Sequence, residues 1–357
     1  MKRGTSITKK DIVEGEIPVV SGGREPAYYC DKYNRDGETI TVAGSGAGAG
    51  YVQYWTKPIF VCDAFSIQGN PGIQTKYIYY FLTNIQDYIY STKKGGGVPH
   101  VHISSIENVS VPVPPLPVQR EIVRILDNFT ELTAELTAEL TARKKQYAYY
   151  RDKLLSTNNS SVPVVELRDI VKKSCSGATP AKGNAEYYEN GTIPWIRTQD
   201  VRFNEITEVN SYITEKAVSE TATKWIPENC VIVAISGATA GRCAINKIKA
   251  TTNQHCLNLI IDDSMALYRY VFHCLCSKYE ELISRKQGAR GDLNSSLILS
   301  LPISIPSLEV QKRLVEVLDN FDAICSDLKI GLPAEIEARQ KQYEYYRDKL
   351  LTFTPAD

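Results

Sequence analysis

The stretch PLPVQREIVRILDNF, residues 115–129, decides how this chain is built, because a close copy, PSLEVQKRLVEVLDNF, fills residues 306–321. The two copies align without a gap from Gln119, which matches Gln311, to the closing Asp-Asn-Phe. Their apolar residues recur at steps of three and four, a spacing typical of an amphipathic helix. A helical block that occurs twice predicts an internal repeat, with two halves built on one plan.

A second pair of matched blocks follows, ARKKQYAYYRDKLL at 142–155 and ARQKQYEYYRDKLL at 338–351. In the first copy they are preceded by ELTAELTAELTA (131–142), whose residues favour helix and whose four-residue step keeps the leucines on nearly one face. Each copy is therefore expected to end in a long helix, the second interrupted at residues 331–333. We expect the two helices to pack antiparallel against each other; the alternative is two ordinary amphipathic helices in separate cores.

These helices are expected to share an apolar stripe, and the first also has the features of a ruler. Adding or removing one ELTA unit would move whatever follows by ~6 Å and rotate it by about 40°. The side chains expected on the stripes are Ile122, Ile125, Phe129, Leu132, Leu136, Leu140, Tyr147, Tyr150 and Leu154 in the first helix, and Leu314, Val317, Phe321, Ile324, Leu328, Ile336, Tyr343, Tyr346 and Leu350 in the second.

Composition places the chain among ordinary globular proteins of two or three domains, with 357 residues, 43% apolar and 23% charged. No apolar run approaches a membrane span and the N-terminus has no apolar signal core, so a cytoplasmic location is expected. Nine cysteines without regular spacing fit reduced thiols. Basic and acidic residues balance at 41 each, so net charge neither supports nor excludes binding to nucleic acid.

A glycine-rich stretch, TVAGSGAGAGYVQY (41–54), resembles a nucleotide loop but lacks its spacing. The glycines alternate, no Gly-Lys-Ser/Thr follows, and the next residues alternate like a strand. The matched stretch IVAISGATAGRCAI (232–245) keeps only two of the four glycines. We therefore predict a tight strand–loop–strand turn in both copies, where glycine lets the backbone approach a neighbour, with DNA as one candidate.

The remaining chemistry-bearing residues give little support for catalysis or metal binding. The chain has no Asn/Asp-Pro-Pro-Tyr/Phe motif of adenine methyltransferases, no convincing nuclease cluster and no helicase loop. His273, Cys274 and Cys276 lie in an apolar run and are expected in a core. The pair His100 and His102 has no other plausible zinc ligand nearby.

The duplicated layout, VPVPPLPVQREIVRILDNFTEL, the ELTA repeat and GLPAEIEARQKQYEYYRDKLLTF resemble the specificity subunit of type I restriction–modification systems. The resemblance covers essentially the whole chain. It implies an α+β fold, with mixed α/β target-recognition domains at 1–114 and 161–304. Two long helical segments, 115–160 and 305–357, would form an antiparallel coiled coil between them, with an internal pseudo-twofold repeat.

The same resemblance implies a non-catalytic subunit. Each recognition domain would read one half of a bipartite double-stranded DNA target, and the helices would set the spacer between the halves. The helices would also dock two methyltransferase subunits, to which restriction–translocase subunits are added. S-adenosylmethionine and ATP would bind those partners, and no cofactor or metal is expected here. The alternatives are a stand-alone methyltransferase or nuclease with unfamiliar motifs, and a coiled-coil adaptor without DNA specificity.

One departure from the repeat concerns the start of the chain. The second copy begins with VPVVELRDIVKK (162–173), which has no counterpart in the first. KRGTS near residue 2 aligns roughly with KKSCSGAT near residue 173. The first recognition domain is therefore expected to be shortened at its N-terminus by about a dozen residues, by comparison with the second copy.

Two loops at matched places, STKKGGGVPHVH (91–102) and SRKQGARGDLNSS (284–296), combine basic residues with glycine. Lysine neutralises phosphates, whereas Arg, Gln and Asn present paired hydrogen bonds to guanine or adenine edges. SGGREP (21–26) and PWIRTQD (194–200) offer further candidates at loop edges. The alternative is that these loops are solvated connections. The residues expected to contact DNA are Arg24, Ser45, Gly46, Lys93, Lys94, His100, His102, Arg197, Gln199, Ser236, Gly237, Arg285, Lys286, Gln287, Arg290 and Asn294.

Overall fold

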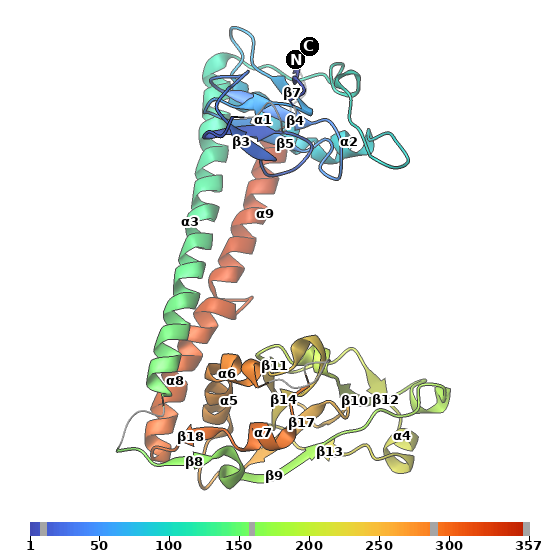
Figure 1. Cartoon of the computed structure of the whole chain (residues 1–357), viewed down its shortest axis with the longest axis vertical. Helices are drawn as coiled ribbons and strands as arrows, with labels where there is room; N and C mark the ends of the chain where they lie inside the picture. Colours follow the sequence, from blue (N-terminus) through green and yellow to red (C-terminus); the bar gives the residue numbers. More distant parts are fainter. Residues whose placement is uncertain (8–12, 157–160, 286–291, 353–357) are drawn as a thin grey trace. The chain divides into compact units, whose positions relative to one another are not determined.

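The computed structural model describes residues 1–7, 13–156, 161–285 and 292–352 (Figure 1). The chain divides into two compact units, each described here by itself. Unit 1 comprises Met1–Ala138 and Ala334–Asp357, and unit 2 comprises Glu139–Pro333. The boundary falls inside the ELTA repeat, so the first long helix contributes residues to both units.

Unit 1 contains two small sheets. Its strands are β1 (Lys2–Arg3), β2 (Ile17–Val20), β3 (Tyr28–Cys30), β4 (Thr39–Ala43), β5 (Val52–Trp55), β6 (Phe60–Val61) and β7 (Ala64–Ile67). The first sheet has the order β1-β7-β4-β5 with antiparallel pairs, and β2 lies between β3 and β6 in the second. β4 is central because its Thr-Ile-Thr-Val run is β-branched, suits a pleated surface and is buried on both faces.

Unit 2 repeats this strand order with additions. Its strands are β8 (Val164–Glu166), β9 (Val171–Ser176), β10 (Ile193–Ile196), β11 (Asn204–Ile206), β12 (Tyr212–Ile213), β13 (Trp225–Ile226), β14 (Val231–Ala234), β15 (Cys243–Asn246), β16 (Ala250–Thr252), β17 (Cys256–Ile261) and β18 (Pro302–Ser304). The order β9-β17-β14-β15 matches β1-β7-β4-β5, and β11 extends it. β10 runs parallel to β16, as β2 does to β6. Both glycine-rich stretches therefore connect antiparallel strands, which confirms the predicted strand–loop–strand turn.

Helices cover one face of each main sheet. The α-helices of the described residues are α1 (Thr75–Asn84), α2 (Gln86–Ser91), α3 (Leu116–Leu154), α4 (Glu215–Glu220), α5 (Tyr268–Ser277), α6 (Tyr279–Ser284), α7 (Ser295–Leu299), α8 (Leu308–Ser326) and α9 (Leu332–Leu351). In unit 1, α1 packs on β4 and β5; in unit 2, α5 packs on β14 and β15 (Figure 1). His273, Cys274 and Cys276 are buried on α5, which confirms their predicted place in a core.

A buried glutamine joins each sheet domain to the start of its long helix. In unit 1, the side chain of Gln119 accepts from the backbone N of Gln74 at 2.9 Å and donates to the carbonyls of Gly72 and Pro114 at 3.1 and 2.8 Å. Gln311 repeats this pattern in unit 2, as its carbonyl accepts from the backbone N of Leu267 at 2.9 Å. Its amide donates to two further carbonyls. Both side chains are fully buried, so the matched glutamines of the repeat fix the same junction twice.

Within each unit, an aromatic ring near the start of one long helix stacks on a tyrosine from the other copy. In unit 1, the rings of Phe129 and Tyr346 lie 5.6 Å apart, centroid to centroid. In unit 2, the matched rings of Phe321 and Tyr150 lie 6.3 Å apart. Each unit therefore combines the helix start of its own copy with the helix end of the other.

The predicted helical stripe is correct only in part. The second helix is interrupted as expected, but at residues 327–331 and not at 331–333, since α8 ends at Ser326 and α9 begins at Leu332. However, Val317 and Ile324 are 44% and 45% exposed, and Leu328 lies beyond α8 and is 72% exposed. The burial instead follows Val315 and Leu318, which pack into the core of unit 2, where apolar surface is removed from water.

The segment unique to the second copy forms an edge of unit 2. β8 pairs with β18 in an antiparallel ribbon, and the following turn, η3 (Leu167–Ile170), places Leu167 and Ile170 in the core. In unit 1, no described strand occupies residues 109–113, which precede α3 as β18 precedes α8. Within the described part of the chain, none of the helices has the length and apolar character that a membrane span needs.

Candidate nucleic-acid interface

Loops that follow matched strands meet in each unit. In unit 1, the backbone N of Val101 donates to the carbonyl of Gly44 at 2.9 Å, and the N of Gly46 donates to Pro99 at 3.0 Å. In unit 2, the N of Leu293 donates to Ile235 at 2.7 Å. The glycine turn and the basic loop of each copy, far apart in sequence, therefore lie together.

The glycines kept in both copies are the ones whose backbone requires glycine. Gly46 and Gly237, at matched positions, have φ values of 81° and 76°. Gly50 and Gly241, the second matched pair, have φ values of 83° and 90°. Side chains rarely adopt this left-handed region, whereas glycine enters it freely. The two glycines of the shared Ser-Gly-Ala-x-Ala-Gly motif are thus explained by the backbone geometry of the turn.

The glycines found only in the first copy have a different cause, which is close packing between loops. A Cβ on Gly48 would lie 2.4 Å from the carbonyl oxygen of Gly22, on the loop after β2. The matched residue in unit 2, Thr239, instead donates its hydroxyl to the carbonyl of Thr198 at 2.8 Å. The backbone of Gly48 therefore approaches the chain's own loop.

The unit 1 site is a cavity of about 290 Å³ that contains both donors and an acceptor. His100 and His102 line it, and their rings are nearly parallel with centroids 6.2 Å apart. Asp63 also lines it and accepts a hydrogen bond from the hydroxyl of Ser45. Four of the described candidates therefore meet here, since Lys94 bridges to His100 through the backbone.

Two other candidates of unit 1 are held over tyrosine rings. The guanidinium of Arg24 lies 4.9 Å from the ring centroid of Tyr51, and the ammonium of Lys93 lies 4.2 Å from that of Tyr90. Cation–π contacts of this kind fix a charge in place while leaving it able to meet phosphate.

The unit 2 site is wider, and it has basic lining residues but no acidic ones. A groove of about 680 Å³ is lined by Lys182, Trp195, Arg197, Gln254 and His255, among others, and no aspartate or glutamate is among its lining residues. We call it the unit 2 groove. Beside it, the turn η5 (Thr198–Asp200), which carries Gln199, packs on the turn η6 (Gly237–Thr239). Arg197, Gln199, Ser236 and Gly237 are thus brought onto neighbouring loops.

The basic loop of the second copy is described only in part. Arg285 forms an ion pair with Glu281 one turn earlier in the helix. Asn294 accepts from the backbone N of Ser296 at 2.9 Å and caps α7. Both side chains therefore also have structural roles. The remaining candidates of this loop, which lie outside the described residues, are Lys286, Gln287 and Arg290.

Sequence reasoning missed several lining residues. Lys182, Gln254 and His255 of the unit 2 groove were not predicted, nor was Asp63 of the unit 1 cavity. A usable signal exists for His255 and Asp63, because each is a polar residue immediately before a matched buried strand, β17 or β7. Lys182 lies in the loop between β9 and β10.

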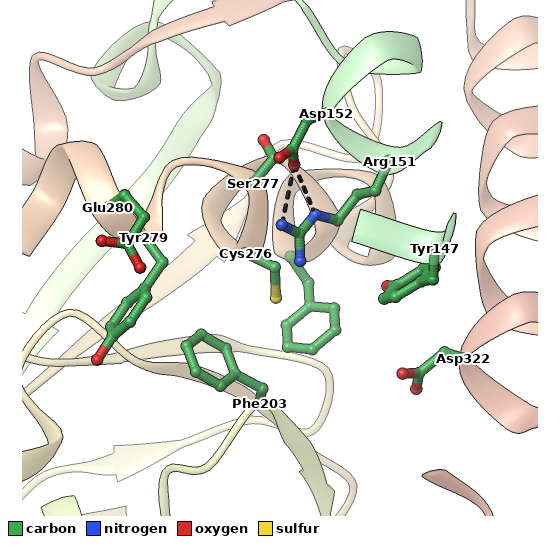
Figure 2. A pocket seen from close by; sticks show the side chains of 10 residues that line it. Tyr147, Arg151, Asp152, Phe203, Cys276, Ser277, Tyr279, Glu280 and Asp322 are labelled. Carbon is green, nitrogen blue, oxygen red and sulfur yellow. Dashed lines mark hydrogen bonds and ion pairs between the residues drawn. The ribbon is translucent and has the colours of Figure 1, made fainter. Parts of the chain in front are cut away.

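A further cavity of unit 2, of about 260 Å³, has the opposite charge (Figure 2). It is lined by Asp152, Glu280 and Asp322 but by a single basic residue, Arg151, which pairs with Asp152 at 2.9 Å. Burial raises the pKa of Asp322. Because carboxylates repel phosphates, this cavity does not fit a DNA contact. Among the described residues, no cluster of three or more His, Cys, Asp or Glu side chains could hold a metal ion.

Comparisons with known proteins agree on one family. The type I restriction modification DNA specificity domain matches residues 1–143 and 159–338. The specificity subunit of EcoR124I/EcoR124II from Escherichia coli is 39% identical over 291 residues, 78% of this chain and 70% of that protein. A putative specificity subunit of Haemophilus influenzae is 29% identical over 362 residues, 96% of this chain and 89% of that protein. The S subunit structure from M. genitalium aligns with a TM-score of 0.62 at 17% identity, over 99% of this chain and 94% of that one.

Proposed function

The chain belongs to the type I restriction–modification specificity subunits, and from this premise we propose that each unit reads one half of a bipartite double-stranded DNA target. The observation that carries the proposal is the pairing of one repeated strand order with two different loop surfaces. A shared scaffold with divergent loops is what two readers of different half-sites require, because loops carry the contacts and the sheet only positions them. The residues proposed to contact DNA are the candidates that lie on the loops around the unit 1 cavity and the unit 2 groove.

We further propose that the long helices form an antiparallel coiled coil related by a pseudo-twofold axis. The matched ring pairs, Phe129 with Tyr346 and Phe321 with Tyr150, support this arrangement. Such a pair would hold the readers at a fixed separation and rotation on one duplex. The ELTA units would then set the spacer, since ~6 Å of helix corresponds to one or two base pairs at ~3.4 Å each.

Matched tyrosines on the helices are the proposed docking points for two methyltransferase subunits. Tyr149 and Tyr345 occupy the same position of the repeated block, and they are 61% and 59% exposed. Lys153 and Lys349 each lie with the ammonium 5.8 Å from the respective ring centroid. Exposed tyrosines beside cations are typical anchors of protein interfaces. Restriction–translocase subunits would join the complex through the methyltransferases. The methyltransferases would bind S-adenosylmethionine, and the complex would act in the cytoplasm.

A domain exchange tests the central proposal. Replacing residues 162–304 by the corresponding segment of another specificity subunit should change one half of the methylated motif and leave the other. Mapping modified adenines in host DNA measures this. A change in both halves, or in neither, contradicts the modular reading. Methylation by the purified chain alone would instead support the stand-alone enzyme.

Deleting one ELTA unit tests the spacer separately. The two half-motifs should stay the same while the number of unspecified bases between them falls. A spacer of unchanged length in the methylated sites would show that the helix is no ruler. Inserting one extra unit provides the matched control, with the opposite expected sign.

A further inference from the structure

We propose that the unit 2 groove recognises a guanine through Arg197. This inference rests on the proposed function, because it assumes that unit 2 reads a half-site, and it adds which base is read and by which side chain. The groove is large enough for a base edge and its described lining offers hydrogen-bond donors without a carboxylate.

The guanidinium of Arg197 is positioned but not neutralised. Its Cζ lies 5.7 Å from the ring centroid of Trp195, and the indole is itself fixed by a hydrogen bond to the carbonyl of Ala178 at 3.2 Å. The Nε of Arg197 is buried and has no hydrogen-bond partner. The nearby carboxylate of Asp200 accepts from the backbone N of Arg197 at 2.8 Å, so it holds the turn.

Two other arginines of unit 2 differ from Arg197 in this respect, whereas Arg242, whose Nε is also buried without a partner, does not line the groove. Arg269 contacts the carboxylates of Asp319 and Glu205, and Arg285 contacts Glu281. Among the interactions of the described residues, none pairs the Arg197 guanidinium with an acid. A buried donor without a partner costs free energy, which an acceptor from a ligand would recover.

The chemistry of the groove favours guanine over adenine. Guanine presents two acceptors, O6 and N7, in the major groove, and a guanidinium can donate to both at once. Adenine presents one acceptor and one donor, so it needs an amide with a free carbonyl. Gln254 does not offer one, because its carbonyl accepts from the hydroxyl of Thr179 and its amide meets the ring of His255 at 3.2 Å. The carbonyl of Asn253 accepts from the backbone N of His255 at 3.2 Å, which leaves Asn210 as the amide of the groove that would compete for adenine. Lys182, at the rim, suits a phosphate.

The test uses the full chain assembled with its methyltransferase subunits and duplexes that carry the methylated target. Each guanine of the half-site read by unit 2 is replaced in turn by 7-deazaguanine, which lacks the N7 acceptor. One such replacement should weaken binding by wild type about 10- to 100-fold. Arg197→Ala should weaken binding to normal DNA by a similar factor and become insensitive to that replacement. Arg197→Lys keeps the charge but loses the paired donors, so it should also bind normal DNA more weakly than wild type does.

Two controls keep the outcome specific. Lys182→Ala should lower affinity equally for all sequences and reduce the slope of log affinity against log salt by about one. Arg168→Ala removes an exposed charge paired with Glu166 in the same unit. It should change neither the affinity for DNA nor the salt slope. If Arg197→Ala keeps the wild-type response to every 7-deazaguanine, the inference is wrong while the proposed function stands. If wild type shows no sequence preference at all, both are wrong.

Discussion

In unit 1, the ammonium of Lys76 lies 2.8 Å from the carboxylate of Asp127, and Tyr80 donates to the same group. In unit 2, Arg269 and His273 contact the matched Asp319 at 2.7 and 2.8 Å. The partners have changed between the copies, but in each unit two donors one helical turn apart meet one aspartate on the long helix. The two copies therefore share the junction between sheet domain and long helix, while its chemistry differs.

The loop surfaces have not been kept in this way. The residue before β7 in unit 1 is Asp63, an acceptor, whereas the residue before the matched β17 is His255. Gly48 of the first copy is Thr239 in the second, and the groove of unit 2 has no carboxylate where the cavity of unit 1 has one. The comparison separates parts that serve one common scaffold from parts that serve two different targets.

Removal of the buried glutamines should have the largest effect. Gln119→Ala and Gln311→Ala each leave a backbone donor and two carbonyls without their partner in a buried site, at a cost of about 3 kcal/mol of unfolding free energy. Hydrogen exchange followed by mass spectrometry should show the loss in unit 1 for the first variant and in unit 2 for the second. Gln340→Ala, on an exposed turn of α9, is the control. Unequal losses would mean that the junctions are not equivalent.

The glycines that differ between the copies should be next in effect. Gly48→Ala forces a Cβ to within 2.4 Å of the Gly22 carbonyl, so unit 1 should lose about 2 kcal/mol. Gly96→Ala, with no atom within 4 Å of the new Cβ, should change stability little. Thermal unfolding of the two variants measures the difference. Equal melting temperatures would show that the loop after β2 moves away without cost.

How much of this was accessible from the sequence depends on what the repeat could reveal. The two copies serve as an internal alignment, so the helical blocks, the break before α9 and the shared turn around Gly46 and Gly237 were predictable. Positions that differ between the copies carry no such signal. Whether Lys182 lines the groove depends on which loops meet there, whereas Trp195 and Arg197 are two residues apart, so their contact is local. The exposed side of α8 was misjudged because periodicity identifies a stripe without saying which partner covers it.

The matched tyrosines should give a smaller effect that is equal in both copies. Tyr149→Ala and Tyr345→Ala should each weaken the binding of one methyltransferase subunit about tenfold, or about 1.4 kcal/mol, as for a moderate interface anchor. Titration calorimetry should then resolve one weakened and one normal site in each single variant. Leu328→Ala, also exposed but outside the repeated block, is the control. If either variant bound both methyltransferase subunits with normal affinity, the interface with those subunits would lie away from these tyrosines.

The smallest effect should concern pH and should involve the junction of unit 2. Burial raises the pKa of Asp319, but hydrogen bonds from His273 and Arg269 outweigh it and leave the pKa below its usual range. A carboxyl group with a lowered folded pKa stabilises the fold above its unfolded pKa of about 3.9 and loses that contribution as pH falls through the folded value. Asp319→Asn should therefore lower stability at pH 7, and its difference from wild type should shrink below about pH 4.

Asp322, one turn later on α8, should show the opposite sign. Burial raises its pKa in the folded state, so its charged form destabilises unit 2 at pH values above that folded pKa. Asp322→Asn should then raise the stability of unit 2 at neutral pH, and the gain should vanish as pH falls and the wild-type carboxyl group becomes protonated. Urea unfolding at several pH values compares the two variants directly. If Asp319→Asn did not lower stability at pH 7, the junction at Asp319 would owe its strength to packing alone. If Asp322→Asn lowered stability at pH 7, burial would not disfavour the charge at that position.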